Sequence, residues 1–185
     1  NWAQYVESFG FGKKLGSDFA SERSGFVPDA GFYDNYYPKW NSLTVISMAI
    51  GQGELGCPPL QMANLAATIA NRGYYYIPHV VKHIDGCDSL DSRFYERHYT
   101  MVDEKHFEPV VDGMWGTVHR EIGTAGVAYV KGLNICGKTG TAQNPHGKDH
   151  STFLAFAPKD DPKIAISVYV ENGGFGSSVA APIAS

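Results

Sequence analysis

Cysteine, long apolar runs and excess basic charge are all scarce in this sequence. The three cysteines, Cys57, Cys87 and Cys136, form no C-x-x-C pair, which argues against a disulfide-rich scaffold and a cysteine-based metal site. One disulfide beside a free thiol stays open if the compartment is oxidising. No run reaches the roughly 18 apolar residues of a membrane helix. The net charge of −4 comes from interspersed acids and bases, so we expect no nucleic-acid partner.

What is present is enough for one folded domain. The 185 residues are 43% hydrophobic, which is ordinary for a globular protein and far from the composition of disordered chains. A chain of this length can bury a substantial core. It opens at Asn1 rather than at Met, so we expect it to be an internal piece of a longer protein.

Apolar periodicity predicts helices first and strands later. Stripes at three- and four-residue spacing predict helices over residues 2–9, 60–71 and 107–120. Prolines suit the first turns of the second and third helices, and Gly73 suits the end of the second. A terminal helix with Pro182 in its first turn is predicted to be capped by Ser177 or Ser178.

The last third of the chain reads as a sheet. Strands are predicted over residues 133–143, 151–157 and 164–171, and their short connections imply antiparallel neighbours. Residues 74–84 are also β-like. Because Pro78 has no N–H to donate, they are predicted to form an edge strand or a bent ribbon rather than a central strand. Residues 43–50 are interpreted as a buried strand or extended segment, and residues 13–41 as a loop. The fold class that follows is α+β, an antiparallel sheet flanked by helices.

Residues 137–143 combine a cation, two hydroxyls and two glycines on one predicted strand. Alternation along the strand puts Lys138 and Gly140 on one face and Thr139 and Thr141 on the other. A glycine within a strand often marks the close approach of a backbone or a ligand. If this strand lies at the edge of a sheet, a peptide can pair with it as a further strand. The Thr141 N–H could then stabilise an oxyanion. Lys138 and the threonine hydroxyls could hold a carboxylate.

Three other patterns carry weaker signals. Residues 51–56 spell G-x-G-x-x-G, the pattern of a dinucleotide-binding turn. Pro58 and Pro59 follow almost directly, and no acid lies about 20 residues further on. A glycine-rich turn is therefore the better interpretation. Residues 33–35 spell Y-x-N within an aromatic loop, where ordinary turn chemistry explains them. The H-x-x-x-H pairs, His79 with His83 and His146 with His150, lack a confident helix and a third ligand for a metal.

The K-T-G strand and its context resemble the transpeptidase domain of class B penicillin-binding proteins. The motif is followed about ten residues later by a second strand of the family's kind, residues 152–158. Residues 50–53, 59–63, 123–125 and 170–174 match family segments in the right order. Together with residues 144–150, they look most like the cell-elongation type (the penicillin-binding protein 2 group). The resemblance implies a fold like that of penicillin-binding proteins and serine β-lactamases.

The resemblance also implies roles for the residues of the K-T-G strand. Lys138 would hydrogen-bond toward a nucleophilic serine and supply positive potential, while Thr139 and Thr141, with Gly140 between them, would bind the carboxylate of a D-Ala-D-Ala stem peptide or of a β-lactam. The Thr141 N–H would form half of the oxyanion hole, so Lys138 and Thr141 are the candidate catalytic residues. No cofactor is expected.

Two family motifs are missing from this sequence. No lysine has Ser or Thr three residues before it, and no S-x-N occurs, so the nucleophile, its activating lysine and the middle-motif serine are absent. We therefore expect residues 1–185 to be the C-terminal part of a transpeptidase domain that is incomplete and inactive alone. The resemblance implies a membrane-anchored parent on the extracytoplasmic face of a bacterial membrane, with a membrane glycosyltransferase partner.

Alternative functions remain open. The same fold could serve a β-lactamase or a D,D-carboxypeptidase, in which water replaces the acceptor amine. A non-catalytic β-lactam sensor or partner-binding module is an alternative of another class. A soluble α+β domain with a fortuitous K-T-G is the remaining interpretation.

Overall fold

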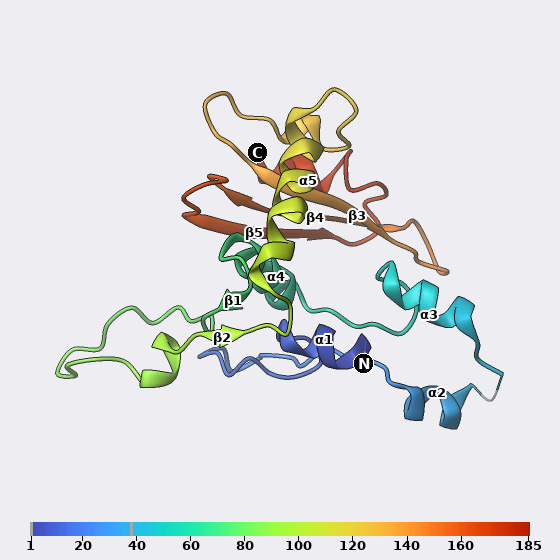
Figure 1. Cartoon of the computed structure of the whole chain (residues 1–185), viewed down its shortest axis with the longest axis horizontal. Coiled ribbons are helices and arrows are strands. Elements are labelled where there is room, and N and C mark those ends of the chain that lie inside the picture. Colours follow the sequence, from blue (N-terminus) through green and yellow to red (C-terminus); the bar gives the residue numbers. More distant parts are fainter. Residues whose placement is uncertain (1, 38) are drawn as a thin grey trace.

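A three-stranded antiparallel sheet lies at one end of the molecule, with helices on both faces (Figure 1). The structure, a computed structural model, describes residues 2–37 and 39–185. The sheet contains β3 (Cys136–Ala142), β4 (His150–Ala157) and β5 (Ile164–Val170) in the order β3-β4-β5. The three predicted strands and their antiparallel pairing are therefore confirmed, with ends that differ by at most three residues.

The register of the sheet joins the K-T-G strand to the middle strand. Lys138 lies opposite Leu154, which in turn lies opposite Ser167 on β5. Because sequential strands pair through short connections, β3 keeps one side free of strands in the described part of the chain. Within residues 2–37 and 39–185, the K-T-G strand is thus an edge strand.

Strand alternation divides the interior into two apolar clusters. Along β4, Phe153 projects to one face and Phe156 to the other. The first cluster is closed by residues of α6 (Ala180–Ala184) and of the 3-10 turn η3 (Gly126–Ala128), and the second by α4 (Pro59–Ala70) and α5 (Phe107–His119). Burying apolar side chains on both faces positions the strands, because each face has a helical layer to pack against.

Helices α4 and α5 match the predicted helices closely. Pro59 lies in the first turn of α4, and Gly73 beyond its end has a φ of +116°. Such a conformation favours glycine and ends the helix. Ala66 is completely buried on α4, where the small side chain lets the helix lie close to the sheet. The first predicted helix is also present as α1 (Trp2–Ser8).

The terminal helix α6 begins later than predicted, and neither Ser177 nor Ser178 caps it. Its N-cap is Val179, which makes no side-chain hydrogen bond. The buried Ser151 of β4 replaces the cap: its hydroxyl accepts a hydrogen bond from the Ala180 N–H at 3.0 Å and donates one to the Phe175 carbonyl at 3.1 Å. The free N–H at the start of α6 is therefore bonded by a residue distant in sequence. The residues next to the helix could not predict this contact.

Residues 29–56 form a helical arm, and here the sequence predictions were wrong. Residues predicted as loop contain α2 (Ala30–Tyr36), and the predicted strand over 43–50 is α3 (Ser42–Ala49). Side-chain caps start both helices, because Asp29 accepts from the Phe32 N–H and Asn41 from the Leu43 N–H. Pro38, which was placed in the predicted loop, lies outside the described residues.

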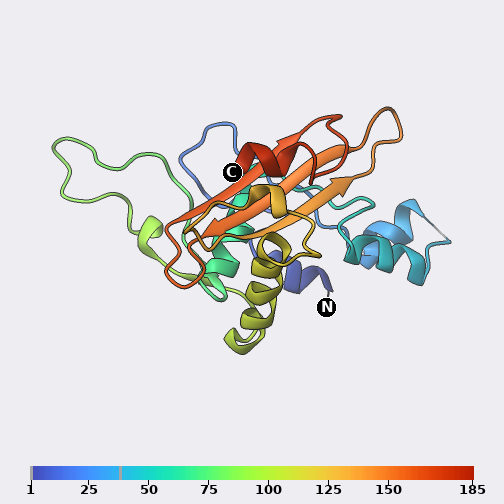
Figure 2. The ribbon, with the colours of Figure 1, turned by 90° about the horizontal axis from the view of Figure 1, so that it is seen from above.

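The arm projects away from the sheet in both ribbon views (Figures 1 and 2). Several apolar side chains of α3 and its C-cap are exposed, among them Leu43 at 70%, Ile46 at 57% and Ile50 at 72%. The arm therefore presents apolar surface to its surroundings.

Most of the predicted β segment over 74–84 is not a strand. Only β1 (Tyr74–Tyr75) pairs, antiparallel with β2 (His98–Tyr99). The chain leaves the ladder before Pro78, which has no N–H to donate, and continues as a long loop containing the 3-10 turn η1 (Ser92–Tyr95). A further turn, η2 (Glu104–His106), leads into α5.

Candidate functional site

The K-T-G residues lie on the open edge of the sheet, as part of β3. Thr139 and Thr141 carry the backbone groups that point away from β4, because each of their carbonyls accepts a hydrogen bond from a side chain outside the ladder. In an antiparallel strand, the N–H and C=O of one residue point the same way. The N–H groups of Thr139 and Thr141 therefore also face outward, where a peptide could add.

Lys138 brings its charge to that same edge. Its ammonium donates a hydrogen bond of 2.7 Å to the Thr139 carbonyl, and its side chain is exposed. Although Lys138 and Thr139 point to opposite faces of the sheet, the long lysine stem reaches the edge between them. The cation and the two outward N–H groups are thus placed on one side of β3, an arrangement that suits an anionic ligand.

A further hydroxyl joins the site from outside the motif. Thr124 Oγ1 lies 3.0 Å from Thr139 Oγ1. The residues on either side of it are held against the end of α5, since a Cβ on Gly123 would collide with the Thr117 carbonyl and the Ala125 N–H donates to that same oxygen at 3.0 Å. The 123–125 segment resembles the family in sequence. The sequence could not assign a role to Thr124, because the distance between Thr124 and Thr139 depends on how α5 packs.

A loop of backbone passes over the strand at Gly140. A Cβ placed on Gly176 would collide with the carbonyl oxygens of Gly140 and Thr152. A Cβ on Gly140 itself would collide with the Thr152 hydroxyl. The 173–178 loop therefore approaches β3 through Gly176, whereas the position of a side chain on Gly140 is taken by Thr152 of the neighbouring strand.

A glutamine from the arm completes the outer edge of β3. The Gln52 side-chain amide donates to the Thr141 carbonyl at 3.0 Å, and its oxygen accepts a longer bond of 3.4 Å from the Gln143 N–H. Gln52 is separated from these partners by about ninety residues of sequence, and its G-x-G-x-x-G segment was predicted only to be a turn. The turn interpretation is correct, but the side chain it presents was missed.

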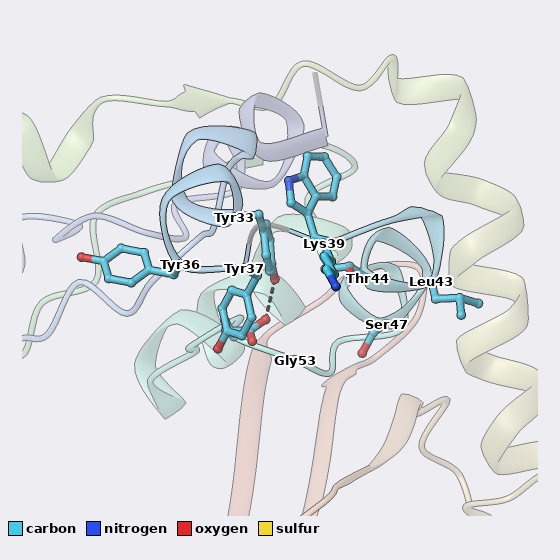
Figure 3. A pocket seen from close by; sticks show the side chains of 10 residues that line it. Tyr33, Tyr36, Tyr37, Lys39, Leu43, Thr44, Ser47 and Gly53 are labelled. Carbon is cyan, nitrogen blue, oxygen red and sulfur yellow. Dashed lines mark hydrogen bonds between the residues drawn. The ribbon is translucent and has the colours of Figure 1, made fainter.

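The open pocket on the arm lies beside that turn (Figure 3). It has a volume of about 670 Å³ and is lined by aromatic residues of α2 and the segment after it, together with residues of α3 and of the turn. Figure 3 shows Tyr33 and Tyr37 beside each other, with the Tyr33 hydroxyl bonded to the Glu54 carboxylate at 2.5 Å. This hydrogen bond holds the pKa of Glu54 below its usual range, and burial raises the pKa of Tyr33. Tyr33, the first residue of the Y-x-N pattern, is thus a buried side chain that anchors Glu54.

The cysteines are free thiols in this structure. Cys136 at the start of β3 is completely buried, and burial raises the pKa of its thiol to about 11. Burial likewise raises the pKa of Cys57 to about 11. A thiol with such a pKa holds its proton at neutral pH and is a poor nucleophile.

The histidine pairs gather no further metal ligands within residues 2–37 and 39–185, where no group of three or more His, Cys, Asp or Glu could hold an ion. Instead, His79 Nδ1 lies 2.8 Å from the Val81 carbonyl, and His150 Nδ1 accepts from the Asn172 N–H at 3.1 Å. Over the same described residues, every helix is too short or too polar to cross a bilayer.

Comparison with known families decides the relationship. The model of the penicillin binding protein transpeptidase domain matches residues 1–185. The chain belongs to this family. It is 35% identical to the peptidoglycan D,D-transpeptidase MrdA of Acinetobacter baumannii over 96% of the chain, and 30% identical to MrdA of Escherichia coli K12 over the same share.

Solved structures agree with this assignment. Pseudomonas aeruginosa PBP2, in a crystal structure with WCK 5153, superposes with a TM-score of 0.84 at 35% identity, over 98% of this chain and 40% of that one. Helicobacter pylori PBP2 in complex with MreC gives a TM-score of 0.80 at 27% identity, over 98% of this chain and 34% of that one. The α+β fold expected from the resemblance is confirmed.

The chain spans less than a third of the MrdA sequences that it matches, 29% in A. baumannii and 31% in E. coli. This share includes the K-T-G strand, but the chain has no S-x-x-K or S-x-N. The chain therefore lacks the nucleophilic serine that the S-x-x-K motif supplies in proteins of this kind.

Proposed function

We propose that residues 1–185 are the C-terminal part of the transpeptidase domain of a longer peptidoglycan D,D-transpeptidase. Family membership over the whole chain and the identity to MrdA proteins support the activity. The missing S-x-x-K and S-x-N motifs support the view that the nucleophile lies in another part of the parent protein. This chain alone would bind the substrate end without cleaving it.

The observation that carries the proposal is the outward edge of β3. Lys138, Thr139 and Thr141 present an ammonium, hydroxyls and two outward N–H groups on an edge that has no strand partner within the described residues. In the proposed site, Lys138 and the two hydroxyls hold the carboxylate of a D-Ala-D-Ala stem peptide or of a β-lactam. Gly140 adds no side chain on the strand face that it shares with Lys138.

The reaction follows from those positions. A serine of the parent protein attacks the carbonyl of the penultimate D-alanine, and the developing oxyanion receives the Thr141 N–H together with the N–H of the nucleophile. D-Alanine leaves with a proton, and an acyl-enzyme forms. The amine of a neighbouring stem peptide then attacks the ester carbonyl, which releases the serine and forms the cross-link.

The proposed setting is the extracytoplasmic face of a bacterial membrane. The relatives named above are peptidoglycan enzymes, one similar structure is a complex of PBP2 with MreC, and another is of a peptidoglycan synthase complex that coordinates polymerization and crosslinking. These relatives support an assembly in which the parent protein is membrane-anchored beside a glycosyltransferase.

A labelling experiment tests the proposal. The parent protein, incubated with a fluorescent penicillin and run on a denaturing gel, should carry a covalent label, and the 185-residue chain alone should carry none. Lys138→Ala in the parent should slow labelling by about 100-fold or more, because it removes the charge beside the oxyanion and carboxylate.

Lys82→Ala provides the matched control, since Lys82 is exposed in the loop between β1 and β2. It should label at the normal rate. A labelled 185-residue band, or near-normal labelling of the Lys138→Ala protein, would contradict the proposal. Rapid loss of the label in water without any cross-linked product would instead indicate a β-lactamase or a carboxypeptidase.

A further inference from the structure

The Gly51-Gln52-Gly53 turn reaches the candidate site although its sequence suggested no such contact. Gly51 and Gly53 have φ values of +79° and +73°, in the left-handed region that favours glycine. Two such residues on either side of Gln52 direct the intervening side chain out of the arm. It ends on the outer edge of β3, at Thr141 and Gln143.

The contact is specific in its chemistry. A primary amide offers one donor and one acceptor in the same plane, and here they meet a carbonyl and an N–H of β3, at 3.0 Å and 3.4 Å respectively. The Gln52 side chain thus satisfies one acceptor and one donor of the strand edge, as the N–H and C=O of one residue in a parallel strand would. A carboxylate of the same shape could accept from Gln143 but could not donate to Thr141.

The arm is held where this contact requires it. Glu54 follows the turn directly, and its carboxylate accepts a hydrogen bond from Tyr33, whose side chain is only 2% exposed. The buried tyrosine therefore fixes the residue two positions after Gln52, which is one of those lining the pocket. This anchoring keeps the glutamine at the strand even though Leu43, Ile46 and Ile50 of the arm are exposed.

We infer that Gln52 is a positioning residue: by bonding the Thr141 carbonyl it holds the backbone at Thr141, and with it the direction of the Thr141 N–H that stabilises the oxyanion. The inference rests on the proposed function of the K-T-G strand. Gln52 bonds the Thr141 carbonyl and thereby limits rotation of the strand edge that carries the Thr141 N–H. The carbonyl keeps a second lone pair, so a substrate amide can still bind there.

Gln52→Glu in the parent protein tests the inference, because it keeps the size of the side chain and removes the donor to Thr141. The acylation rate constant for a penicillin should fall by roughly 10- to 100-fold, the loss that a small misplacement of catalytic groups produces. The dissociation constant of the non-covalent complex should change much less, because carboxylate binding by Lys138 and Thr139 is untouched. Gln52→Ala should slow acylation at least as much.

A spectroscopic measurement separates positioning from general damage. In the acyl-enzyme formed with a carbonyl-labelled penicillin, weaker hydrogen bonding to the ester oxygen should shift the infrared carbonyl stretch to higher frequency in Gln52→Glu than in wild type. Gln4→Glu, an exposed glutamine on α1, makes the same charge change and should alter neither the rate nor the stretch.

The outcomes are distinct. A Gln52→Glu protein with unchanged rate and unchanged carbonyl stretch would overturn the inference, and so would faster acylation, which would mean that Gln52 occupies the substrate's place. If the wild-type parent is not acylated at all, the proposed function fails before the variant is compared. Equal thermal unfolding of the wild-type and variant proteins establishes that the fold is intact.

Discussion

The sheet and the arm both contain runs of apolar residues, but they are held in different ways. In the sheet, Phe153 and Phe156 are almost fully buried, because helices cover both faces. In the arm, Leu43 and Ile46 of α3 are mostly exposed. The comparison teaches that apolar sequence forms a core only where the topology supplies a second layer.

The same difference applies to the parts of the candidate site. The K-T-G residues are positioned by a sheet whose register is set by buried side chains on both faces. Gln52 is positioned by two glycine turns and by the Tyr33–Glu54 hydrogen bond. We therefore expect the sheet side of the site to be rigid and the arm side to respond to small changes in charge or conformation.

Phe153→Ala should give the largest effect, because it removes a ring that is 2% exposed and packs against Gly137. The free energy of unfolding should fall by about 3–5 kcal/mol, as for other buried phenylalanines. Ile46→Ala in the arm, where the side chain is 57% exposed, should change it by no more than about 0.5 kcal/mol. Urea denaturation measures both, and similar losses would break the contrast between sheet and arm.

Gly176→Ala should have an intermediate effect. The new methyl group would collide with the carbonyl oxygens of Gly140 and Thr152, and forcing the loop away from β3 should cost about 1–3 kcal/mol of unfolding free energy. Gly113→Ala is the control, because nothing lies within 4 Å of its added Cβ on α5. There the substitution should stabilise by up to about 1 kcal/mol, and equal destabilisation by both would refute the role of the close approach.

The smallest effect is expected from acidification of the arm. Tyr33 donates to the Glu54 carboxylate and lowers its pKa, although burial opposes the shift. A lowered folded-state pKa means that the carboxylate's stabilising contribution is complete above its ordinary pKa of about 4.3 and is lost as the pH falls through the lowered value. The arm should therefore loosen at acid pH before the sheet unfolds.

Fluorescence of Trp40, whose ring centroid lies 5.7 Å from that of Tyr33, can follow this transition once Trp2 and Trp115 are replaced by phenylalanine. Far-UV circular dichroism follows the whole fold on the same samples. Tyr33→Phe should remove the separate acid transition. A single transition seen by both probes would show that arm and sheet unfold together.

The sequence was a good guide wherever a local pattern had one structural outcome. Turn residues between β-rich runs led to β3, β4 and β5, and helical spacing led to α4 and α5. It failed for α3, because a short apolar run fits a strand as well as a helix and the cap at Asn41 decided between them. It also failed for the cap of α6, which comes from Ser151 on another element.

Some residues of the candidate site could be predicted from the sequence and others could not. Lys138, Thr139, Gly140 and Thr141 could be named from the sequence because they are adjacent on one strand and resemble a known motif. Thr124 and Gln52 could not be assigned to the site in this way. Their contacts with β3 depend on how the end of α5 and the arm come to lie against the strand.

The sequence by itself determined the family, the antiparallel strands and the residues of the K-T-G motif, because each is a property of neighbours along the chain. Only the tertiary structure decided which backbone groups of β3 face outward, which loop passes over Gly140 and which amide completes the edge at Thr141. These features depend on contacts between residues far apart in sequence, and periodicity and spacing carry no information about such contacts.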